Sequence, residues 1–280
     1  MEKNRVLFSV IFGDYENLRE LEIVREENVD YILFTDSLTL QSDTWQIEKI
    51  PTRLMGDLVR SQRLIKICQP LQIKKYQQSL YIDNSVRLKK SVNQILDNLL
   101  ANDQIAIPLH SYRKTVRDEF STVLAAKLDS REKLEEQLEH YERHYPEVLS
   151  EQPFWTGIIA RNNFENNINN WEQVWADHVL RYSRRDQLSL NIAIRVSNVQ
   201  ITPMELDNYN SDWHEWPILE NRKDASRVTQ VVDYKYLAQE LSQQVELLSA
   251  QLDRILNSKS WKITKLLRYL NKHIFLSKRL

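Results

Sequence analysis

Glycine is scarce in this chain of 280 residues, which contains only three. Gly-rich phosphate loops and dinucleotide-binding fingerprints both need several glycines within one turn, because the backbone must approach a phosphate closely. Neither motif can be present anywhere in the sequence. Any diphosphate that the protein binds must therefore be held by cationic side chains or by a metal ion.

The sequence also has little cysteine, almost no net charge and no long apolar run. Cys68 is the only cysteine, which rules out an internal disulfide and fits a reducing compartment. The 38 basic and 39 acidic residues give a formal net charge of -1, so no overall field favours nucleic acid. No run approaches the roughly 20 apolar residues that span a bilayer, and the start of the chain lacks the apolar stretch of a signal peptide. We therefore expect a cytoplasmic protein, with any membrane contact peripheral at the inner face of the plasma membrane.

Short apolar runs alternate with helical patterns along most of the chain. Strands are predicted at 6–12, 31–36, 45–51, 79–83, 104–108 and 154–161. Helical periodicity is found at 57–69, 91–100 and 115–145, and an aromatic helix follows with Trp171 and Trp175. Strands that alternate with helices favour an α/β fold with a mainly parallel, covered sheet.

The pattern changes after residue 225. From Tyr234 to Ile255, apolar residues recur at spacings of four and three without Gly or Pro, which predicts a short coiled coil and a homo-oligomer through 234–256. Residues 261–280 combine an apolar side with basic residues, so this helix could lie on an anionic membrane surface or dock on the globular domain. We expect a globular domain at 1–225 and a helical extension at 226–280.

A predicted strand ends at Asp83, and open α/β folds bind their ligands beyond the carboxyl ends of their strands. Mn²⁺ and Mg²⁺ take oxygen ligands, usually one or two carboxylates plus substrate phosphates. Asp83 is therefore the first candidate metal ligand, Asn84 and Ser85 offer weaker oxygens, and His110 or His214 could supply a third ligand. The alternatives are a turn-capping aspartate and structural or merely exposed histidines.

Three basic residues, Arg60, Arg63 and Lys66, recur at three-residue steps within a predicted helix. A helix presents such residues along one flank, where they could neutralise a diphosphate leaving group. A solvated basic face is the alternative. Asp14 and Asp36 each follow a predicted strand, where they could bind a nucleoside's base and ribose or simply form turns.

Asp186 lies in a segment crowded with arginines, so its carboxylate is expected to be ionised and held by charge-assisted hydrogen bonds. An ionised carboxylate there could act as a base or stabilise positive charge at a reacting carbon. The alternative is an N-cap for a helix that starts at Gln187, and both roles are compatible.

Taken in this order, these residues resemble a glycosyltransferase family first described as a domain of unknown function, which includes plant mucilage-related and turgor-regulation-defect proteins. The resemblance covers roughly residues 5–195, and its most specific motif is Arg185-Asp186-Gln187-Leu188-Ser189. The motifs are Phe12-Gly13-Asp14-Tyr15, Phe34-Thr35-Asp36, Arg60 with Arg63 and Lys66, Tyr81-Ile82-Asp83, His110, Glu119, Ile159-Ala160-Arg161 and Arg185-Asp186-Gln187-Leu188-Ser189.

The resemblance implies a GT-A type nucleotide-diphospho-sugar transferase fold, with a Rossmann-like mixed sheet and flanking helices. With the residue patterns above, we expect catalytic roles for Asp186 and Gln187, and a Mn²⁺ or Mg²⁺ site at Asp83, Ser85, His110 and His214. The expected nucleotide-sugar site consists of Phe12, Gly13, Asp14, Tyr15, Asp36, Arg60, Arg63, Lys66 and Asn84. In related GT-A families the strand-end aspartate belongs to an Asp-x-Asp motif, but here Ser85 stands at the position of the second aspartate. The side chains of Arg60, Arg63 and Lys66 could therefore take the place of the metal.

The tail at 255–264 resembles the ending of many bacterial surface-polysaccharide glycosyltransferases, which implies a role in the cell envelope. The expected function is transfer of a sugar from a nucleotide-diphosphate donor to a glycan or lipid-linked acceptor. Two alternatives remain open. One is a non-catalytic scaffold or binding protein of a glycan-synthesis assembly, and the other is a sugar-nucleotide hydrolase or phosphotransferase.

Overall fold

The computed structural model describes residues 3–13, 16–54, 56–100, 104–164, 168–217, 234–258, 261–262 and 264. The main sheet contains β1 (Arg5–Ile11), β2 (Val29–Thr35), β3 (Gln46–Lys49), β4 (Gln78–Ile82), β6 (Ile105–Pro108), β7 (Ile158–Asn162) and β8 (Thr202–Met204). A small second sheet pairs β5 (Arg87–Leu88) with β9 (His214–Glu215). The helices are α1 (Leu58–Cys68), α2 (Leu71–Lys74), α3 (Val92–Leu99), α4 (Val116–Ala125), α5 (Arg131–His144), the 3-10 helix η1 (Val148–Ser150), α6 (Ile168–Arg181), α7 (Gln187–Ser197) and α9 (Tyr234–Asn257).

The main sheet has the strand order β3-β2-β1-β4-β7-β6-β8. Neighbouring strands run parallel except where β7 pairs with β4 and with β6. The predicted α/β fold with a mixed sheet and flanking helices is thereby confirmed. Because β7 is antiparallel, its first residues lie at the same edge as the carboxyl ends of β4 and β6, and Asp83 N donates to Gly157 O over 2.9 Å.

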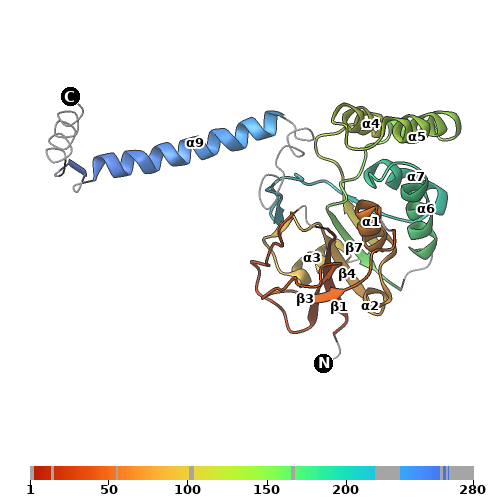
Figure 1. Cartoon of the computed structure of the whole chain (residues 1–280), viewed down its shortest axis with the longest axis horizontal. Helices are drawn as coiled ribbons and strands as arrows, with labels where there is room; N and C mark the ends of the chain where they lie inside the picture. Colours follow the sequence, from red (N-terminus) through yellow and green to blue (C-terminus); the bar gives the residue numbers. More distant parts are fainter. Residues whose placement is uncertain are drawn as a thin grey trace. The chain divides into compact units, whose positions relative to one another are not determined.

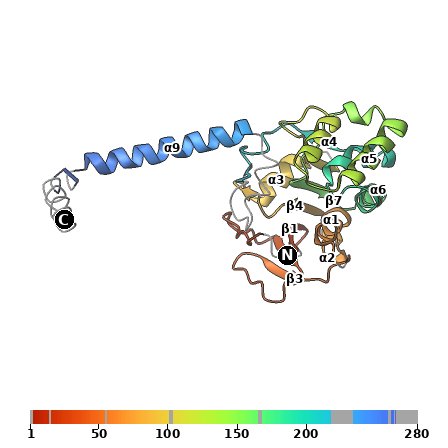
Figure 2. The same ribbon diagram turned by 45° about the horizontal axis from the view of Figure 1, so that its top comes forward.

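Apolar side chains cover both faces of the sheet, because successive residues of a strand point to opposite sides. On one face, Phe8 and Tyr81 pack with Trp171 and Trp175 of α6. The other face holds α3 and Trp155. Figure 1 shows α1, α6 and α7 grouped beside the sheet, and Figure 2 shows α1 and α6 on one side of it with α3 on the other.

The helical stretch expected at 115–145 is divided into α4 and α5. Lys127 between them has a φ of 52°, a left-handed conformation that ends the first helix. The side chain of Ser130 then caps the second helix by accepting from Lys133 N. A third apolar cluster under these helices includes Phe120, Tyr141 and, from α7, Leu188.

The chain divides into two units, Met1–Val231 and Val232–Leu280. The boundary predicted at 225 falls within 218–233, outside the described residues. In the second unit α9 is a single helix of 24 residues, as its periodicity predicts, while the coiled-coil pairing stays a prediction. The predicted basic helix at 261–280 also lies outside the described residues, except for 261, 262 and 264. Among the helices that the structure describes, none has the length and apolar character needed to cross a membrane.

Candidate functional site

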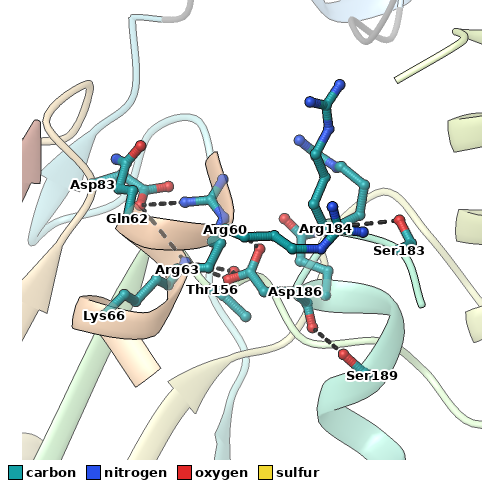
Figure 3. Close-up of polar contacts among 12 residues, drawn as sticks. Arg60, Gln62, Arg63, Lys66, Asp83, Thr156, Ser183, Arg184, Asp186 and Ser189 are labelled. Carbon is teal, nitrogen blue, oxygen red and sulfur yellow. Dashed lines mark hydrogen bonds and ion pairs between the residues drawn. The ribbon is translucent and has the colours of Figure 1, made fainter. Parts of the chain in front are cut away.

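Four charged side chains meet beyond the carboxyl end of β4. Lys66 Nζ lies 2.7 Å from Asp186 Oδ2 and 3.6 Å from Asp83 Oδ1. Arg63 Nε lies 3.2 Å from Asp186 Oδ1, and its Nη1 lies 4.0 Å from Asp83 Oδ1. Figure 3 shows the two cations of α1 between the two carboxylates. We call Arg63, Lys66, Asp83 and Asp186 the four-charge cluster.

Helix α1 presents two of its three predicted cations to this cluster and directs the third elsewhere. Asp57 caps the helix, since its side chain accepts from Arg60 N. The Arg60 guanidinium donates to Val179 O over 2.8 Å and to Tyr182 O over 2.6 Å, and it also pairs with Asp57. Arg60 therefore closes the last turn of α6, where helix carbonyls lack partners within the helix.

The Asp186 carboxylate is buried, and both of its oxygens have partners. Besides its two ion pairs, it accepts a hydrogen bond of 2.9 Å from the Thr156 hydroxyl, and it is only 2% exposed. Burial opposes ionisation, but Arg63 and Lys66 outweigh it and hold the pKa of Asp186 well below its usual range. Its side chain makes no capping bond to α7, so the carboxylate serves the cluster and not the helix that follows it.

The segment before Asp186 is held in place by the loop between α4 and α5. Asp129 accepts from the Ser183 hydroxyl over 2.8 Å and from Arg184 N over 2.7 Å. On the other side, the Asp186 carbonyl accepts from Trp175 Nε1 over 2.9 Å. The Asp186 side chain is thus positioned from both sides, as preorganised electrostatics requires.

Lys66 has no exposed surface. Its ammonium donates to Thr156 Oγ1 over 2.9 Å and lies 5.1 Å from the centre of the Tyr81 ring. Burial lowers the pKa of Lys66, while Asp186 and Asp83 oppose that change. A buried ammonium is tolerated only with such partners, so Lys66 and Asp186 depend on each other.

Asp83 is the more accessible carboxylate, with 28% of its side chain exposed against 3% for Asp186. Its Oδ1 accepts from the Tyr81 hydroxyl over 2.6 Å. Burial and the charge of Asp83 raise the pKa of the Tyr81 phenol well above its usual value. Of the two carboxylates in the cluster, Asp83 is therefore the one that a ligand from solvent can reach.

The other oxygens near Asp83 are occupied by protein groups. Asn84 accepts from Arg19 N over 2.9 Å and donates to Asn17 O over 2.8 Å, which ties down the loop after β1. Ser85 Oγ accepts from Trp216 Nε1 over 3.0 Å. Both side chains are about 5% exposed, so they support the neighbouring loops.

The two candidate histidines do not join Asp83. His214 is fully buried, with Nδ1 2.8 Å from Ser211 Oγ and Nε2 2.8 Å from Asn208 O, so both ring nitrogens have partners. His110 Nε2 lies 3.8 Å from Glu119 Oε2. Within the described residues, no group of three or more His, Cys, Asp or Glu side chains is arranged to hold a metal ion. Of the predicted metal ligands that the structure describes, Asp83 has the accessible carboxylate.

The predicted nucleoside site is described only in part. Gly13 N donates to Asp36 Oδ1 over 2.9 Å, and a φ of 75° at Gly13 is a conformation that favours glycine. Phe12 is buried in the core. Asp14 and Tyr15 lie outside the described residues, and Asp36 holds the turn that leads to them.

A second buried polar group lies around Glu119, to which the sequence assigned no role beyond the resemblance. Arg113 Nε lies 3.2 Å from Glu119 Oε2, and Gln187 Nε2 donates to Glu119 Oε1 over 3.5 Å. Burial raises the pKa of Glu119 and lowers that of His110 to about 3, so this histidine is neutral at pH 7. Gln187 therefore links the segment of Asp186 to this group.

Thr156 was not among the predicted site residues, and Tyr81 was named only within the Tyr81-Ile82-Asp83 motif. Thr156 reads as part of the strand predicted at 154–161, but the strand begins at Ile158 and leaves Thr156 at the sheet edge. Its hydroxyl bridges Lys66 and Asp186 only because β7 inserts between β4 and β6. Such a contact carries no local sequence signal.

Comparisons with known proteins identify the family of this chain. The family model "TOD1/MUCI70, glycosyltransferase-like domain" matches residues 1–210. No curated protein matches the chain. Matches are found to 149 chains of solved structures, and one is core-mannan synthase A from Aspergillus fumigatus in a Mn/GDP form, at 11% identity, 72% coverage of each chain and a TM-score of 0.42. The family match spans most of the sequence, so this chain belongs to the TOD1/MUCI70 glycosyltransferase-like family.

Proposed function

We propose that this protein transfers a sugar from a nucleotide-diphosphate donor to a glycan or lipid-linked acceptor. The observation that carries the proposal is the pair of cations, Arg63 and Lys66, held between Asp83 and Asp186 at the carboxyl edge of the sheet. Ligands of open α/β folds bind at this edge. Membership of the family supports glycosyl transfer as the reaction class.

The cluster suits a diphosphate leaving group, on which negative charge develops as the bond to the sugar breaks. Arg63 is partly accessible, with 15% of its side chain exposed, so its guanidinium could contact a phosphate directly. Lys66 is buried behind it and contributes its charge at short range, where the low dielectric strengthens the effect. Arg60, one turn earlier on α1, fixes that helix to the end of α6 through its bonds to Val179 O and Tyr182 O.

Asp186 acts in this proposal as a positioning residue. Its carboxylate pairs with both cations and with Thr156, which fixes them before a donor arrives. The sequence-based role as a base at the acceptor stays a prediction, as does the catalytic role of Gln187. The buried ion pairs favour the positioning role, because a paired carboxylate of lowered pKa is a weak base.

A divalent cation, Mn²⁺ or Mg²⁺, would bind at Asp83 together with donor phosphates. When bound, it would add positive charge next to the leaving diphosphate. Ser85, His110 and His214 make other contacts, so Asp83 is the protein ligand that we assign. Arg63 and Lys66 supply part of the same charge, which suits a site with a single protein carboxylate.

The test is thermal unfolding of the full chain with a panel of nucleotide sugars, each with and without Mn²⁺. At a donor concentration 100 times its Kd, linkage stabilises the folded state by about 2.7 kcal/mol, which is a rise in Tm of about 5–10 °C. Arg63→Gln should abolish the rise, whereas Arg131→Gln, an exposed arginine of α5, should retain it. A panel that leaves Tm unchanged for the unmodified chain would overturn the proposal.

Two other functions are alternatives to this proposal. A scaffold of a glycan-synthesis assembly is favoured by Ser85, which stands in place of a second carboxylate and pairs with Trp216. Such a protein would bind no donor. A sugar-nucleotide hydrolase would bind the donor and release its sugar to water without an acceptor, so rapid donor turnover in acceptor-free buffer would favour it.

On the resemblance of its tail, we also propose that the protein acts at the cytoplasmic face of a bacterial membrane, in the synthesis of surface polysaccharide. Helix α9 supports a homo-oligomer. Val245, Leu248, Leu252 and Ile255 are spaced by three and four residues, and each is more than half exposed. A second copy of the same helix would cover this stripe.

A further inference from the structure

A groove of about 550 Å³ lies between α7 and the edge strand β8, and none of the four-charge cluster lines it. Its walls combine three amide side chains with apolar surface. The amides are Asn191, Asn198 and Gln200, and the apolar residues include Phe154, Val199 and Ile201.

Asn191 gives the groove a polar group that the protein leaves unpaired. It is 4% exposed, and its Nδ2 donates over 3.1 Å to Glu151 Oε2 and over 3.1 Å to Gln152 O. These two bonds fix the amide, while its Oδ1 is buried without a hydrogen-bond partner. A buried acceptor that lacks a partner costs stability, so it points to a donor from a ligand. A hydroxyl group would fit.

The charges of the groove exclude an anionic ligand. Arg195 pairs with Glu147 at 3.3 Å and also with Glu151, so its positive charge is already balanced by two carboxylates. A phosphate or a nucleotide would meet net negative charge there. A neutral molecule rich in hydroxyls suits the amides, and its C–H faces suit the apolar wall.

The groove starts close to the four-charge cluster. Asn191 follows Asp186 by five residues, which is about 7.5 Å along a helix, and Asn198 follows it by twelve residues, which is about 18 Å. Phe154 precedes Thr156, whose hydroxyl bonds to Asp186. The groove and the four-charge cluster are thus built on the same part of the chain, α7 and the residues just before it.

We propose that the groove between α7 and β8 binds a stretch of neutral oligosaccharide belonging to the acceptor glycan. The role as acceptor site rests on the proposed transferase function, but binding of the saccharide itself does not. Asn191 would accept from a sugar hydroxyl, and Asn198 and Gln200 would exchange hydrogen bonds at the open side.

The test is calorimetric titration of the full chain, without donor, with neutral hexasaccharides of glucose, mannose and xylose. One of them is expected to bind, and Gln200→Ala with Asn198→Gly should weaken it about tenfold or more, as two lost hydrogen bonds predict. Glycine suits position 198 because its φ is 52°. Asn191→Leu should abolish binding, and a circular-dichroism melt shows whether that variant is folded.

Gln46→Ala is the matched control, because this amide is exposed on β3 and does not line the groove. It should bind the hexasaccharide as the unmodified chain does. Equal affinity of the Gln200→Ala/Asn198→Gly chain would overturn the inference, as would the absence of binding by any hexasaccharide. Binding of an extended peptide along β8 in place of sugars would overturn it too.

Parallel titration with nucleotide sugars separates the two proposals. Binding of a donor without binding of a saccharide would refute the proposal for the groove and leave the transferase proposal intact. Binding of a saccharide without binding of a donor would support the groove as a glycan site and refute the transferase proposal.

Discussion

Lys66 and Asp186 form a buried ion pair of 2.7 Å that joins α1 to the start of α7. Neither side chain is more than 3% exposed, and Thr156 bonds to both of them. The pair connects two segments that are far apart in the sequence and holds the cations of α1 at the carboxyl edge of the sheet. Stability and ligand binding should therefore depend on the same contact.

Lys66→Met should destabilise the fold by about 3–5 kcal/mol, because the buried Asp186 loses one of its two cationic partners. The double variant Lys66→Met/Asp186→Asn should lose less than the sum of the single changes, with a coupling of about 0.5–3 kcal/mol. Urea unfolding of the four chains measures this cycle. Arg131→Met, at an exposed ion pair, is the control and should leave the midpoint nearly unchanged. Additive losses would show that the two residues act independently.

Asp83→Ala should remove metal-dependent donor binding and leave the fold intact, because the side chain is partly exposed and its partners retain other contacts. The measurement is donor affinity with and without Mn²⁺, together with a thermal melt of the free protein. Asp177→Ala, on the exposed side of α6, is the matched control. A manganese-dependent affinity that survives Asp83→Ala would rule out this carboxylate as the metal ligand.

The stability of the protein should fall as the pH is lowered from about 6.5 toward 3, in part through His110. Burial lowers the pKa of this histidine to about 3 in the folded state, whereas the unfolded chain takes up a proton near pH 6.5. Between these values the unfolded state binds more protons, so stability rises with pH by up to about 1.4 kcal/mol per pH unit.

His110→Gln should flatten this dependence, because glutamine does not titrate. Unfolding free energies at pH 7 and pH 4.5 test it, with the exposed His144→Gln as the control. The lowered pKa of Asp186 acts in the same direction but further down the scale, since its stabilisation is present above the unfolded pKa near 3.9 and is lost below it. A pH profile identical to that of the unmodified chain would mean that His110 is solvated.

Leu248→Ser should convert the homo-oligomer that we propose into a monomer, because it places a hydroxyl in the middle of the apolar stripe of α9. Leu247→Ser is a closely matched control, since both leucines are 62% exposed but only Leu248 lies on the stripe. Sedimentation equilibrium of the full chain gives the mass of each variant. If both changes leave the mass equal to that of the unmodified chain, the stripe does not hold copies together.

Removal of the chain after Asn257 should release the protein from vesicles that contain anionic lipid, if the basic helix lies on the membrane surface. Attraction to such lipids is about 1 kcal/mol per basic residue near the surface. Co-sedimentation with anionic and with purely zwitterionic vesicles measures it. Equal recovery of the shortened and full chains would assign the tail another role, such as docking on the globular domain.

Much of the site follows from local patterns in the sequence. The strand that ends at Ile82, just before Asp83, is set by hydrophobic periodicity, and the three-residue spacing of Arg63 and Lys66 places both on one side of a helix. These features place a carboxylate at the ligand edge and two cations on one flank of α1. The scarcity of glycine by itself excludes a glycine-rich phosphate loop.

The tertiary structure decided which of the candidates meet. Arg60 has the same spacing as its neighbours but turns to the end of α6, and His214 is enclosed by Ser211 and Asn208. Thr156 enters the site only through the antiparallel β7. The reason is physical: periodicity reports which face of an element is buried, whereas the partner of a buried polar group depends on how distant segments pack. The sequence alone determined most of the elements and the chemical groups available, and packing across the sheet decided that Arg63, Lys66 and Asp186 meet.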